Sequence, residues 1–395
     1  MSFVSRKAAL FGESTIRNMT LVSRQYGAIN LAQGLPEDDT PEILKQACIE
    51  AIQTSHNQYA RTWGIPELGA ALASKMRHFQ GFDFDPETQL TVCCGGTEAM
   101  MASFLATLDP GDEVLIPYPY YENYRAELLM CGAVPVFVPL SLSQEMSFEL
   151  DVDRWEDFVS VRTKGIVINS PQNPTGKVYT RSELQRLANF AIKHNLLVYT
   201  DETYEHMVYA GFEHVSPATL PGMAERTITI SSLSKTYAAT GWRIAWAIAE
   251  PEIANAIRKV HDFLTISAPH PMQKAAVVAL DLPDSYYQQL LHTYTERRQI
   301  VCSGLEQAGF RFVWPQGAYY VLVHLGDLLK PDESVYDFGL RLIHEAGVAS
   351  VPGSAFMPED DPTPWMRLSF CKQLETLYAG IEKLTQWKRS LSQLE

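Results

Sequence analysis

The sequence predicts an α/β protein whose central sheet is mostly parallel. Short runs rich in Val, Ile and Leu alternate with helical patterns, and this alternation is typical of parallel strands joined by crossover helices. The expected strands are residues 90–93, 113–116, 134–138, 165–169, 196–200, 227–230 and 244–248. Helical patterns lie between them, at residues 98–108 and 181–194 among others. Ligands of such sheets bind beyond the carboxyl ends of the strands, so we expect the chemistry there.

The pattern changes after residue 280. A long charged helix over residues 285–308 is followed by a strand at 319–324, a helix at 335–346 and a closing helix that begins at Leu374. We therefore expect three parts, which are an N-terminal arm that contributes to a small domain (1–45), a large domain (46–280) and a small C-terminal α/β domain (281–395). At the start of the large domain, Thr40 is predicted to cap a helix that has Pro41 at its first position.

Charge and composition exclude several classes of protein. The 395 residues hold 32 Lys and Arg against 46 Asp and Glu, and the net charge of −14 argues against a nucleic-acid binder. No apolar run approaches the roughly 18 residues that a membrane span needs, and the first residues do not form a secretory signal, so we expect a soluble, cytoplasmic protein. None of the six Cys stands in a CxxC pair and the ten His show no metal-binding spacing, so no metal is expected.

The most informative segment is SSLSKTY, residues 231–237, which follows an expected strand. Lys235 stands in this Ser-rich loop, and Arg243 follows eight residues later among Trp, Ile and Ala. An arginine in apolar surroundings is costly unless an anion pairs with it, and a partly desolvated lysine can lose its proton and attack a carbonyl. Together the two residues indicate a cofactor that carries both an aldehyde and a phosphate.

From these residues the chain resembles the fold-type I pyridoxal-phosphate (PLP) enzymes, specifically the class I aminotransferases near the kynurenine/glutamine and broad-range aspartate subgroups. The resemblance covers nearly the whole chain. It implies PLP fold type I, pyridoxal 5′-phosphate bound in the large domain, and a homodimer whose active sites lie at the subunit interface. Lys235 matches the lysine that forms the aldimine, and Arg243 matches the arginine on the phosphate.

Asp201 directly follows the expected strand 196–200. A carboxylate at that position can keep a pyridine nitrogen protonated, which makes the ring an electron sink. The resemblance gives Asp201 this role, and it makes Tyr204 and Asn173 the partners of the ring's phenolic oxygen. The expected catalytic residues are Lys235, Asp201 and Tyr204. Asn173 lies in SPQNPTG, a segment that is also typical of a simple turn.

Gly95, Gly96 and Thr97 lie between an expected strand and an expected helix. The backbone N–H groups at such a junction bind anions, and glycine permits close approach of the backbone. The resemblance places the cofactor phosphate here, with Gly96 and Thr97 as donors and with Ser232 and Ser234 as additional ligands. A solvated Ser-rich turn is the alternative for the two serines.

Tyrosines are numerous in the segment YPYYENY, residues 118–124, and a flat ring is suited to stack on a pyridine. The family pattern, an aromatic residue three positions before a Tyr or His, selects Tyr121 rather than Tyr120 for this contact. Tyr59 resembles the tyrosine that reaches the phosphate in the partner subunit.

Recognition of a substrate carboxylate requires a planar donor of two hydrogen bonds. Arg367, flanked by apolar residues, matches the family's carboxylate arginine, and Gly34 with Leu35 matches the substrate-binding segment opposite. Two positions depart from the family pattern. Asp38 stands where relatives carry an aromatic residue, and Thr203 stands where they often carry a bulky apolar one. An acidic residue there indicates either a preference for basic substrates or the start of a helix.

These residues predict an aminotransferase that moves an amino group between an L-amino acid and a 2-oxo acid by a ping-pong mechanism through an aldimine on Lys235. The alternative is another PLP reaction on the same scaffold, either β-elimination from a cysteine conjugate or γ-replacement and cyclisation of a basic, arginine-like amino acid. A PLP-binding regulator is disfavoured because the chain has no basic face, and a nicotinamide enzyme is disfavoured because the dinucleotide fingerprint is missing.

Overall fold

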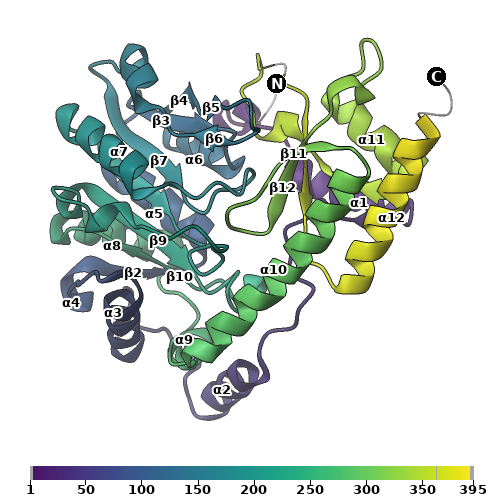
Figure 1. Ribbon diagram of the computed structural model, residues 1–395. Coiled ribbons are helices and arrows are strands. Elements are labelled where there is room, and N and C mark those ends of the chain that lie inside the picture. The colour runs from purple at the N-terminus through teal and green to yellow at the C-terminus, as the bar shows by residue number, and fades with distance from the viewer. Residues whose placement is uncertain (1–2, 362, 392–395) are drawn as a thin grey trace.

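The computed structural model describes residues 3–361 and 363–391, which form two large sheets and two short two-stranded ones, with helices packed around them (Figure 1). The large sheet has seven strands, in the order β2 (Leu90–Cys93), β10 (Ala245–Ile248), β9 (Thr227–Ser232), β8 (Leu197–Asp201), β7 (Thr163–Asn169), β3 (Glu113–Tyr118) and β4 (Val134–Pro139). Only β10 runs antiparallel to its neighbours. The predicted α/β class and all seven predicted strands are confirmed, with end points that differ by a few residues at most.

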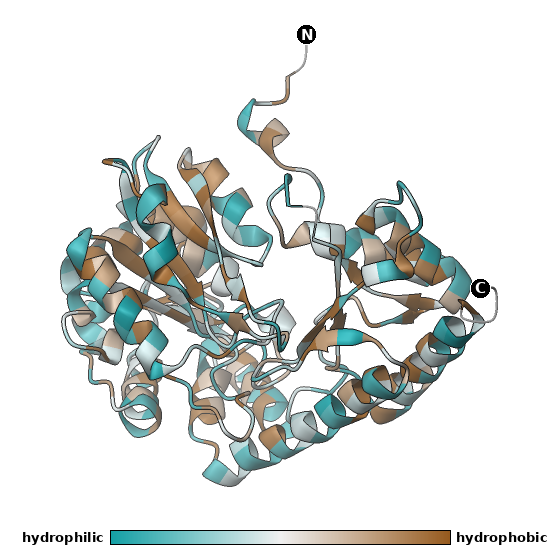
Figure 2. Cartoon of the chain, turned by 45° about the horizontal axis from the view of Figure 1, so that its top comes forward, coloured by the Kyte–Doolittle hydropathy of each residue, from teal (hydrophilic) through white to brown (hydrophobic). Residues whose placement is uncertain are grey.

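Helices cover both faces of the large sheet because successive residues of each strand point to opposite sides. In β7, Ile166 and Ile168 pack toward α7 (Arg181–Lys193), whereas Val167 packs toward the other face. That second face is covered by α5 (Gly96–Thr107), α6 (Asn123–Cys131) and α8 (Pro251–Thr265). Figure 2 shows apolar strands enclosed between helices of mixed hydropathy. The strands are therefore buried on both sides, which explains their continuous apolar sequences.

The second sheet is antiparallel and lies on the side of the molecule drawn in green and yellow in Figure 1. Its strands are, in order, β11 (Arg311–Val313), β12 (Tyr320–His324), β15 (Trp365–Ser369) and β14 (Val351–Pro352). Around it lie α10 (Asp284–Gln307), α11 (Val335–Ala346), α12 (Leu374–Leu391) and the N-terminal α1 (Thr15–Gln25). The short strand β1 (Ile29–Asn30) pairs with β13 (Val348–Ala349), so the N-terminal segment joins this half of the fold.

The remaining elements are α2 (Glu42–Gln53), α3 (Pro66–Gln80), α4 (Pro86–Gln89), α9 (His270–Leu280) and the hairpin of β5 (Ser141–Leu142) and β6 (Phe148–Glu149). Helices α2 and α9 pack together, and the long α10 runs from there to the second sheet (Figure 1). Among the described residues, no helix combines the length and the apolar character needed to cross a membrane.

The prediction for the start of α2 is wrong in detail. The helix begins at Glu42, Pro41 is its cap with an extended backbone (φ −50°, ψ 134°), and no side chain caps it. Thr40 instead donates its hydroxyl hydrogen to the carbonyl oxygen of Ala238, 2.9 Å away. A tertiary hydrogen bond thus takes the hydroxyl that the local pattern assigned to the helix.

Candidate active site

A cavity of about 440 Å³ lies at the carboxyl ends of the large-sheet strands, and residues of the second sheet complete its wall. All but two of the predicted site residues line it, namely Gly34, Leu35, Gly96, Thr97, Tyr121, Asn173, Asp201, Tyr204, Ser232, Ser234, Lys235, Arg243 and Arg367. The two exceptions are Gly95 and Tyr59. Gly95 directly precedes the lining residue Gly96 in the sequence, and the side chain of Tyr59 is exposed. The fold therefore gathers residues from opposite ends of the sequence around one space.

Lys235 follows β9 and projects into this cavity from a short turn. Its Nζ donates a hydrogen bond to the Gly34 carbonyl oxygen at 3.4 Å, and the Tyr319 hydroxyl donates to the same oxygen at 3.1 Å. Burial lowers the pKa of Lys235 to about 8, although the charge of Asp201 acts in the opposite direction. An amine with this pKa loses its proton more readily than an exposed lysine, so it is suited to act as a nucleophile and base.

Asp201 is the last residue of β8, and both of its carboxylate oxygens are held. Oδ2 accepts from the Tyr124 hydroxyl at 2.7 Å, and Oδ1 accepts from the Thr203 hydroxyl at 2.7 Å and the Thr203 N–H at 3.2 Å. These three donors fix the orientation of the carboxylate. Tyr124 and Thr203 were not predicted in this role. This bond gives a local reason for the short polar side chain of Thr203, because a bulky apolar side chain at this position could not donate it.

The loop that precedes α5 forms the anion-binding end of the cavity. Gly95 caps this helix with φ 88°, a conformation that favours glycine, and a Cβ atom there would lie 2.1 Å from Nη2 of Arg243. The guanidinium therefore packs directly on the loop backbone. Ser232 and Ser234, whose hydroxyls are 2.6 Å apart, line the same end. Backbone N–H groups, hydroxyls and an arginine together form a site that suits a phosphate.

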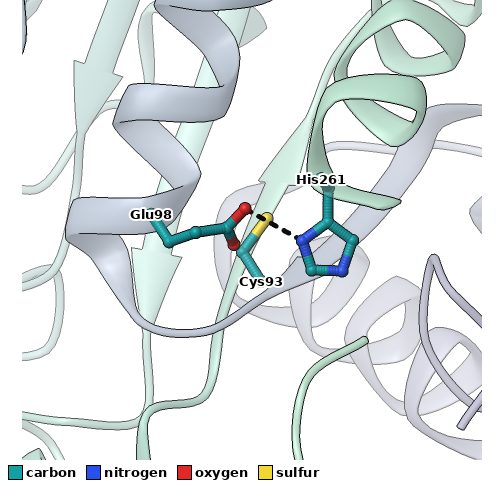
Figure 3. A group of neighbouring side chains, drawn as sticks. All are labelled: Cys93, Glu98 and His261. Carbon is teal, nitrogen blue, oxygen red and sulfur yellow. Dashed lines mark hydrogen bonds and ion pairs between the residues drawn. The ribbon is translucent and has the colours of Figure 1, made fainter. Parts of the chain in front are cut away.

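Behind this loop, Glu98, His261 and Cys93 form a compact cluster (Figure 3). One oxygen of Glu98 lies 2.9 Å from Nδ1 of His261, and the other accepts from the backbone N–H of Cys94 at 2.9 Å. Their atom types are those of a metal site, but the Glu98 oxygens and His261 Nδ1 are engaged in these bonds. The cluster ties the first turn of α5 to α8, and this contact steadies the anion-binding loop.

Arg367 on β15 also lines the cavity and is 1% exposed. Its Nη1 donates to Oδ1 of Asn173 at 2.7 Å and its Nη2 donates to the Ala32 carbonyl oxygen at 2.8 Å, while Nε has no partner. The aromatic rings of Tyr320 and Phe356 flank the guanidinium at 4.2 and 4.8 Å. No carboxylate pairs with Arg367 within the described ranges 3–361 and 363–391, so a buried positive charge faces the cavity ready for an external anion.

The tyrosines of the 118–124 segment have different surroundings. Tyr120 packs in the core, with its ring centroid 4.9 Å from that of Phe137, whereas Tyr121 lines the cavity and packs edge-on against Tyr124. Tyr121 is thus the one placed to contact a ligand ring. Tyr204, also at the cavity, has its hydroxyl 3.0 Å from that of Tyr320.

Asp38 does not line the cavity. Its two carboxylate oxygens accept from Arg297 at 2.5 and 2.7 Å, and one of them also accepts from Gln373 at 3.2 Å. Asp38 therefore serves neither of the two roles considered for it, because α2 begins four positions later and the carboxylate is taken by an arginine of α10. Sequence reasoning did not identify Arg297, which lies 259 positions away.

Sequence reasoning also missed Glu127, a carboxylic acid on α6 that lines the cavity. It is 2% exposed, and neither of its oxygens has a hydrogen-bond partner. Burial, followed by the negative charge of Asp201, raises the pKa of Glu127 well above its usual value of 4.5. Glu127 is a single glutamate within a helix, and nothing in the sequence around it distinguishes it from a glutamate on the surface.

Glu127→Gln is expected to change how stability depends on pH. Because the pKa is raised in the folded state, the contribution of Glu127 is fully present below about pH 4.5 and is lost as the pH rises toward the folded-state pKa, at up to about 1.4 kcal/mol per pH unit. In the variant, the free energy of unfolding should not show this decrease with rising pH. Urea unfolding measured between pH 5 and 8 would detect the difference. Glu113→Gln is the control, since Arg162 pairs with Glu113 at 2.6 Å and the pKa of Glu113 is lowered. Equal pH slopes in wild type and Glu127→Gln would contradict the prediction.

Fold and cavity together define an α/β enzyme that has a reactive lysine, an anion site and a carboxylate site in one space. Residues 26–384 match the family model for aminotransferase class I and II, and the chain belongs to this family. It is 36% identical to a probable N-succinyldiaminopimelate aminotransferase of Mycobacterium tuberculosis over 95% of this chain and 96% of that protein. It is 33% identical to a kynurenine–oxoglutarate transaminase of Dictyostelium discoideum, with 98% and 96% covered.

Solved structures agree with the sequence comparison. The N-succinyldiaminopimelate aminotransferase of M. tuberculosis superposes with a TM-score of 0.93, covering 98% of this chain and 100% of that one at 36% identity. Aspartate aminotransferase of Thermus thermophilus with maleate gives a TM-score of 0.90 at 33% identity, with 98% of this chain and all of that one covered. The predicted family is confirmed, and the enzyme is an aminotransferase.

Enzymes of this family use pyridoxal 5′-phosphate, and the cavity fits that cofactor. Arg243, the Gly95–Thr97 loop and the two serines suit its phosphate, Asp201 suits its ring nitrogen, and Lys235 suits its aldehyde. Within the described residues Arg243 forms no ion pair, so its charge is left for the phosphate.

Gly95→Ala is expected to weaken binding of pyridoxal 5′-phosphate about tenfold or more. The added Cβ would strike Arg243, and the backbone conformation itself costs about 1–3 kcal/mol for a residue with a side chain. The dissociation constant can be measured by absorbance titration of protein freed of cofactor. Gly241→Ala is the matched control, since a Cβ there meets no atom within 4 Å, and equal affinities for the two variants would refute the prediction.

Proposed function

We propose that this aminotransferase moves an amino group between an L-amino acid and a 2-oxo acid in a ping-pong cycle, with Lys235 as the residue that bonds to the cofactor. The observation that carries the proposal is the placement of Lys235 at the wall of a cavity that Arg243 and Arg367 also line. One arginine suits the phosphate of the cofactor and the second suits the carboxylate of the substrate. The reacting amine then comes to lie near Lys235.

In this proposal each residue has a separate task. Bound pyridoxal 5′-phosphate supplies the aldehyde that takes up the amino group and the ring that accepts electrons. Arg367 holds the substrate carboxylate through the guanidinium edge that Nε leaves free. Lys235 Nζ takes the proton from the substrate Cα, and its lowered pKa makes the neutral amine accessible near pH 8. Asp201, held by Tyr124 and Thr203, keeps a proton on the ring nitrogen. Tyr121 stacks on the ring, and Tyr204 and Asn173 bind its phenolic oxygen.

We further propose a homodimer with shared active sites, acting in the cytoplasm. Tyr59 is 76% exposed and lies outside the cavity of its own chain, which is consistent with a contact to the phosphate in a second copy. Six free cysteines suit a reducing compartment. The proposed domain division remains 1–45, 46–280 and 281–395, with the cofactor in the large domain.

The lyase and cyclase alternatives are not favoured. The relatives described above are named as aminotransferases or transaminases, and the two residues that supported a basic substrate have other partners. Asp38 is bound to Arg297, and Thr203 is bound to Asp201.

A single-turnover experiment tests the proposal. The holoenzyme is mixed with a panel of L-amino acids in the absence of any 2-oxo acid, and absorbance and products are followed. We expect stoichiometric conversion to pyridoxamine phosphate and release of one 2-oxo acid per site. Multiple turnovers that release ammonia with pyruvate, or that yield a cyclised amino acid, would reject it.

A further inference from the structure

Glu127 lines the active-site cavity but has no task in the proposed function. It is 2% exposed, and both of its carboxyl oxygens lack a hydrogen-bond partner, whereas Asp201 at the same cavity is held by three donors. A buried polar group without a partner costs free energy, so native structures satisfy nearly all such groups. An exception that faces a ligand cavity calls for an explanation in terms of what the cavity binds.

Glu127 lies on the same face of α6 as the tyrosine that holds Asp201. Tyr124 and Glu127 are three residues apart in this helix, and side chains at this spacing are neighbours on a helix surface. The Tyr124 hydroxyl donates to Oδ2 of Asp201 at 2.7 Å, and all three residues line the cavity. One carboxyl group from β8 and one from α6 therefore share the same part of the cavity wall, close enough for the charge of Asp201 to act on Glu127.

No positive charge offsets this arrangement, because no cation pairs with Glu127 among residues 3–361 and 363–391. Helix α6 packs against α5, β4 and the short helix η1 (Lys7–Leu10). The charged residue of α5, Glu98, is bonded to His261, β4 has no ionisable side chain, and Nζ of Lys7 donates to a backbone carbonyl oxygen of α6 at 3.1 Å. Burial raises the pKa of each of the other ionisable neighbours, which are uncharged at neutral pH, namely Tyr121, Tyr124 and Cys131.

In the protein without cofactor, the two carboxyl groups together hold a proton. Burial, followed by the negative charge of Asp201, raises the pKa of Glu127 well above its usual value of 4.5. Two carboxyl groups that share a site cannot both ionise at low cost. The proton belongs to Glu127, since the oxygens of Asp201 accept hydrogen bonds from Tyr124 and Thr203 and those of Glu127 accept none.

We propose that Glu127 is a positioning residue that acts through Asp201, giving up its proton when a protonated ring nitrogen binds beside Asp201, so that two carboxylates stabilise that positive charge together. The protons balance, because the one that leaves the Glu127 carboxyl group offsets the one that the ring nitrogen gains. A nearby positive charge favours the ionised form of a carboxyl group. This inference rests on the proposed role of Asp201 and adds a second carboxyl group to it.

Binding of pyridoxal 5′-phosphate to the cofactor-free protein tests the proton balance directly. Isothermal titration in two buffers that contain no primary amine and differ in ionisation enthalpy gives the number of protons taken up per site. At neutral pH we expect Glu127→Gln to take up about one more proton per site than the wild type, because the amide has no proton to release. Glu127→Asp keeps a carboxyl group and should return the proton uptake toward the wild-type value.

Glu113→Gln is the matched control for these titrations. Glu113 is also buried, but it pairs with Arg162 at 2.6 Å and does not line the cavity. Its proton uptake should equal that of the wild type. A difference that appears only in Glu127→Gln therefore reports the carboxyl group at the cavity, which a purely structural role of Glu127 would not produce.

The absorption of the holoenzyme gives a second readout that needs no turnover. If Glu127 is ionised beside the bound cofactor, its replacement by glutamine removes a negative charge. The pH at which the cofactor absorption changes should then fall by about 0.5 to 1 pH unit in Glu127→Gln, because a neighbouring negative charge favours the protonated form of the cofactor. Glu113→Gln should leave this pH unchanged.

Asp201→Asn separates failure of the inference from failure of the proposed function. Equal proton uptake in the wild type and Glu127→Gln would overturn the inference. If Asp201→Asn alters the cofactor absorption and Glu127→Gln does not, the inference fails and the proposed role of Asp201 stands. If neither variant alters the absorption, the proposed role of Asp201 fails together with the inference.

Discussion

Lys235→Ala is expected to lower the rate of amino-group transfer by at least about 10⁴-fold, the largest effect of any single substitution in this chain. The change removes the covalent attachment point and the base together, and proton transfer by a positioned side chain alone contributes about 10² to 10⁴. The measurement is the single-turnover rate with the best donor, and the cofactor content is determined separately. Added methylamine should restore part of the rate, because a small amine can take up the proton in the space that the side chain leaves.

The control for this experiment is Lys274→Ala, which removes a half-buried lysine outside the cavity that pairs with Glu67 at 2.7 Å. Its rate should match that of the wild type. If Lys235→Ala turned over within about tenfold of the wild type, Lys235 would not be the catalytic residue and the proposed mechanism would fail.

Arg367→Gln is expected to lower kcat/KM for every amino acid by about 30-fold to several thousand-fold. Removing one partner from a buried, hydrogen-bonded charge pair costs about 2–5 kcal/mol, and each 1.4 kcal/mol is about tenfold. Arg367→Lys should recover little of this loss, because an ammonium group lacks the planar pair of donors. The Asn173 and Ala32 contacts of Arg367 are also lost, so the melting temperature of each variant must be measured alongside.

A primary amine without a carboxylate, used as the substrate, distinguishes loss of carboxylate binding from a general structural effect of the substitution. The wild-type enzyme should react with it slowly, and Arg367→Gln should react at the same rate because no carboxylate contact exists to lose. A decrease for the amine as large as that for amino acids would show that Arg367 acts through structure, and the predicted role in carboxylate binding would then be wrong.

Local sequence determined much of the large sheet and most of the cavity residues. Parallel strands buried on both faces require continuous apolar runs, so strands at residues 165–169 and 227–230 could be predicted without a structure. The observed β7 and β9 are each two residues longer. Lys235 and Arg243 were recognisable because both are charged residues close to apolar strands, where burying an unpaired charge costs free energy. Asp201 was recognisable because it ends a strand, and strand ends meet at one edge of the sheet.

Tertiary structure alone decided which polar groups meet across long distances in the chain. Asp38 accepts hydrogen bonds from Arg297, and the Thr40 hydroxyl donates to the backbone oxygen of Ala238. The carboxyl oxygens of Glu127 have no hydrogen-bond partner beside the cavity. None of these outcomes follows from a local pattern, because each depends on how separate elements pack. The sequence therefore determined the strands, which are recognised by their apolar runs, and the reactive residues, which are recognised by their chemistry. The identity of each hydrogen-bond and charge partner was decided by packing, since such bonds form only between groups that the fold brings within about 3 Å.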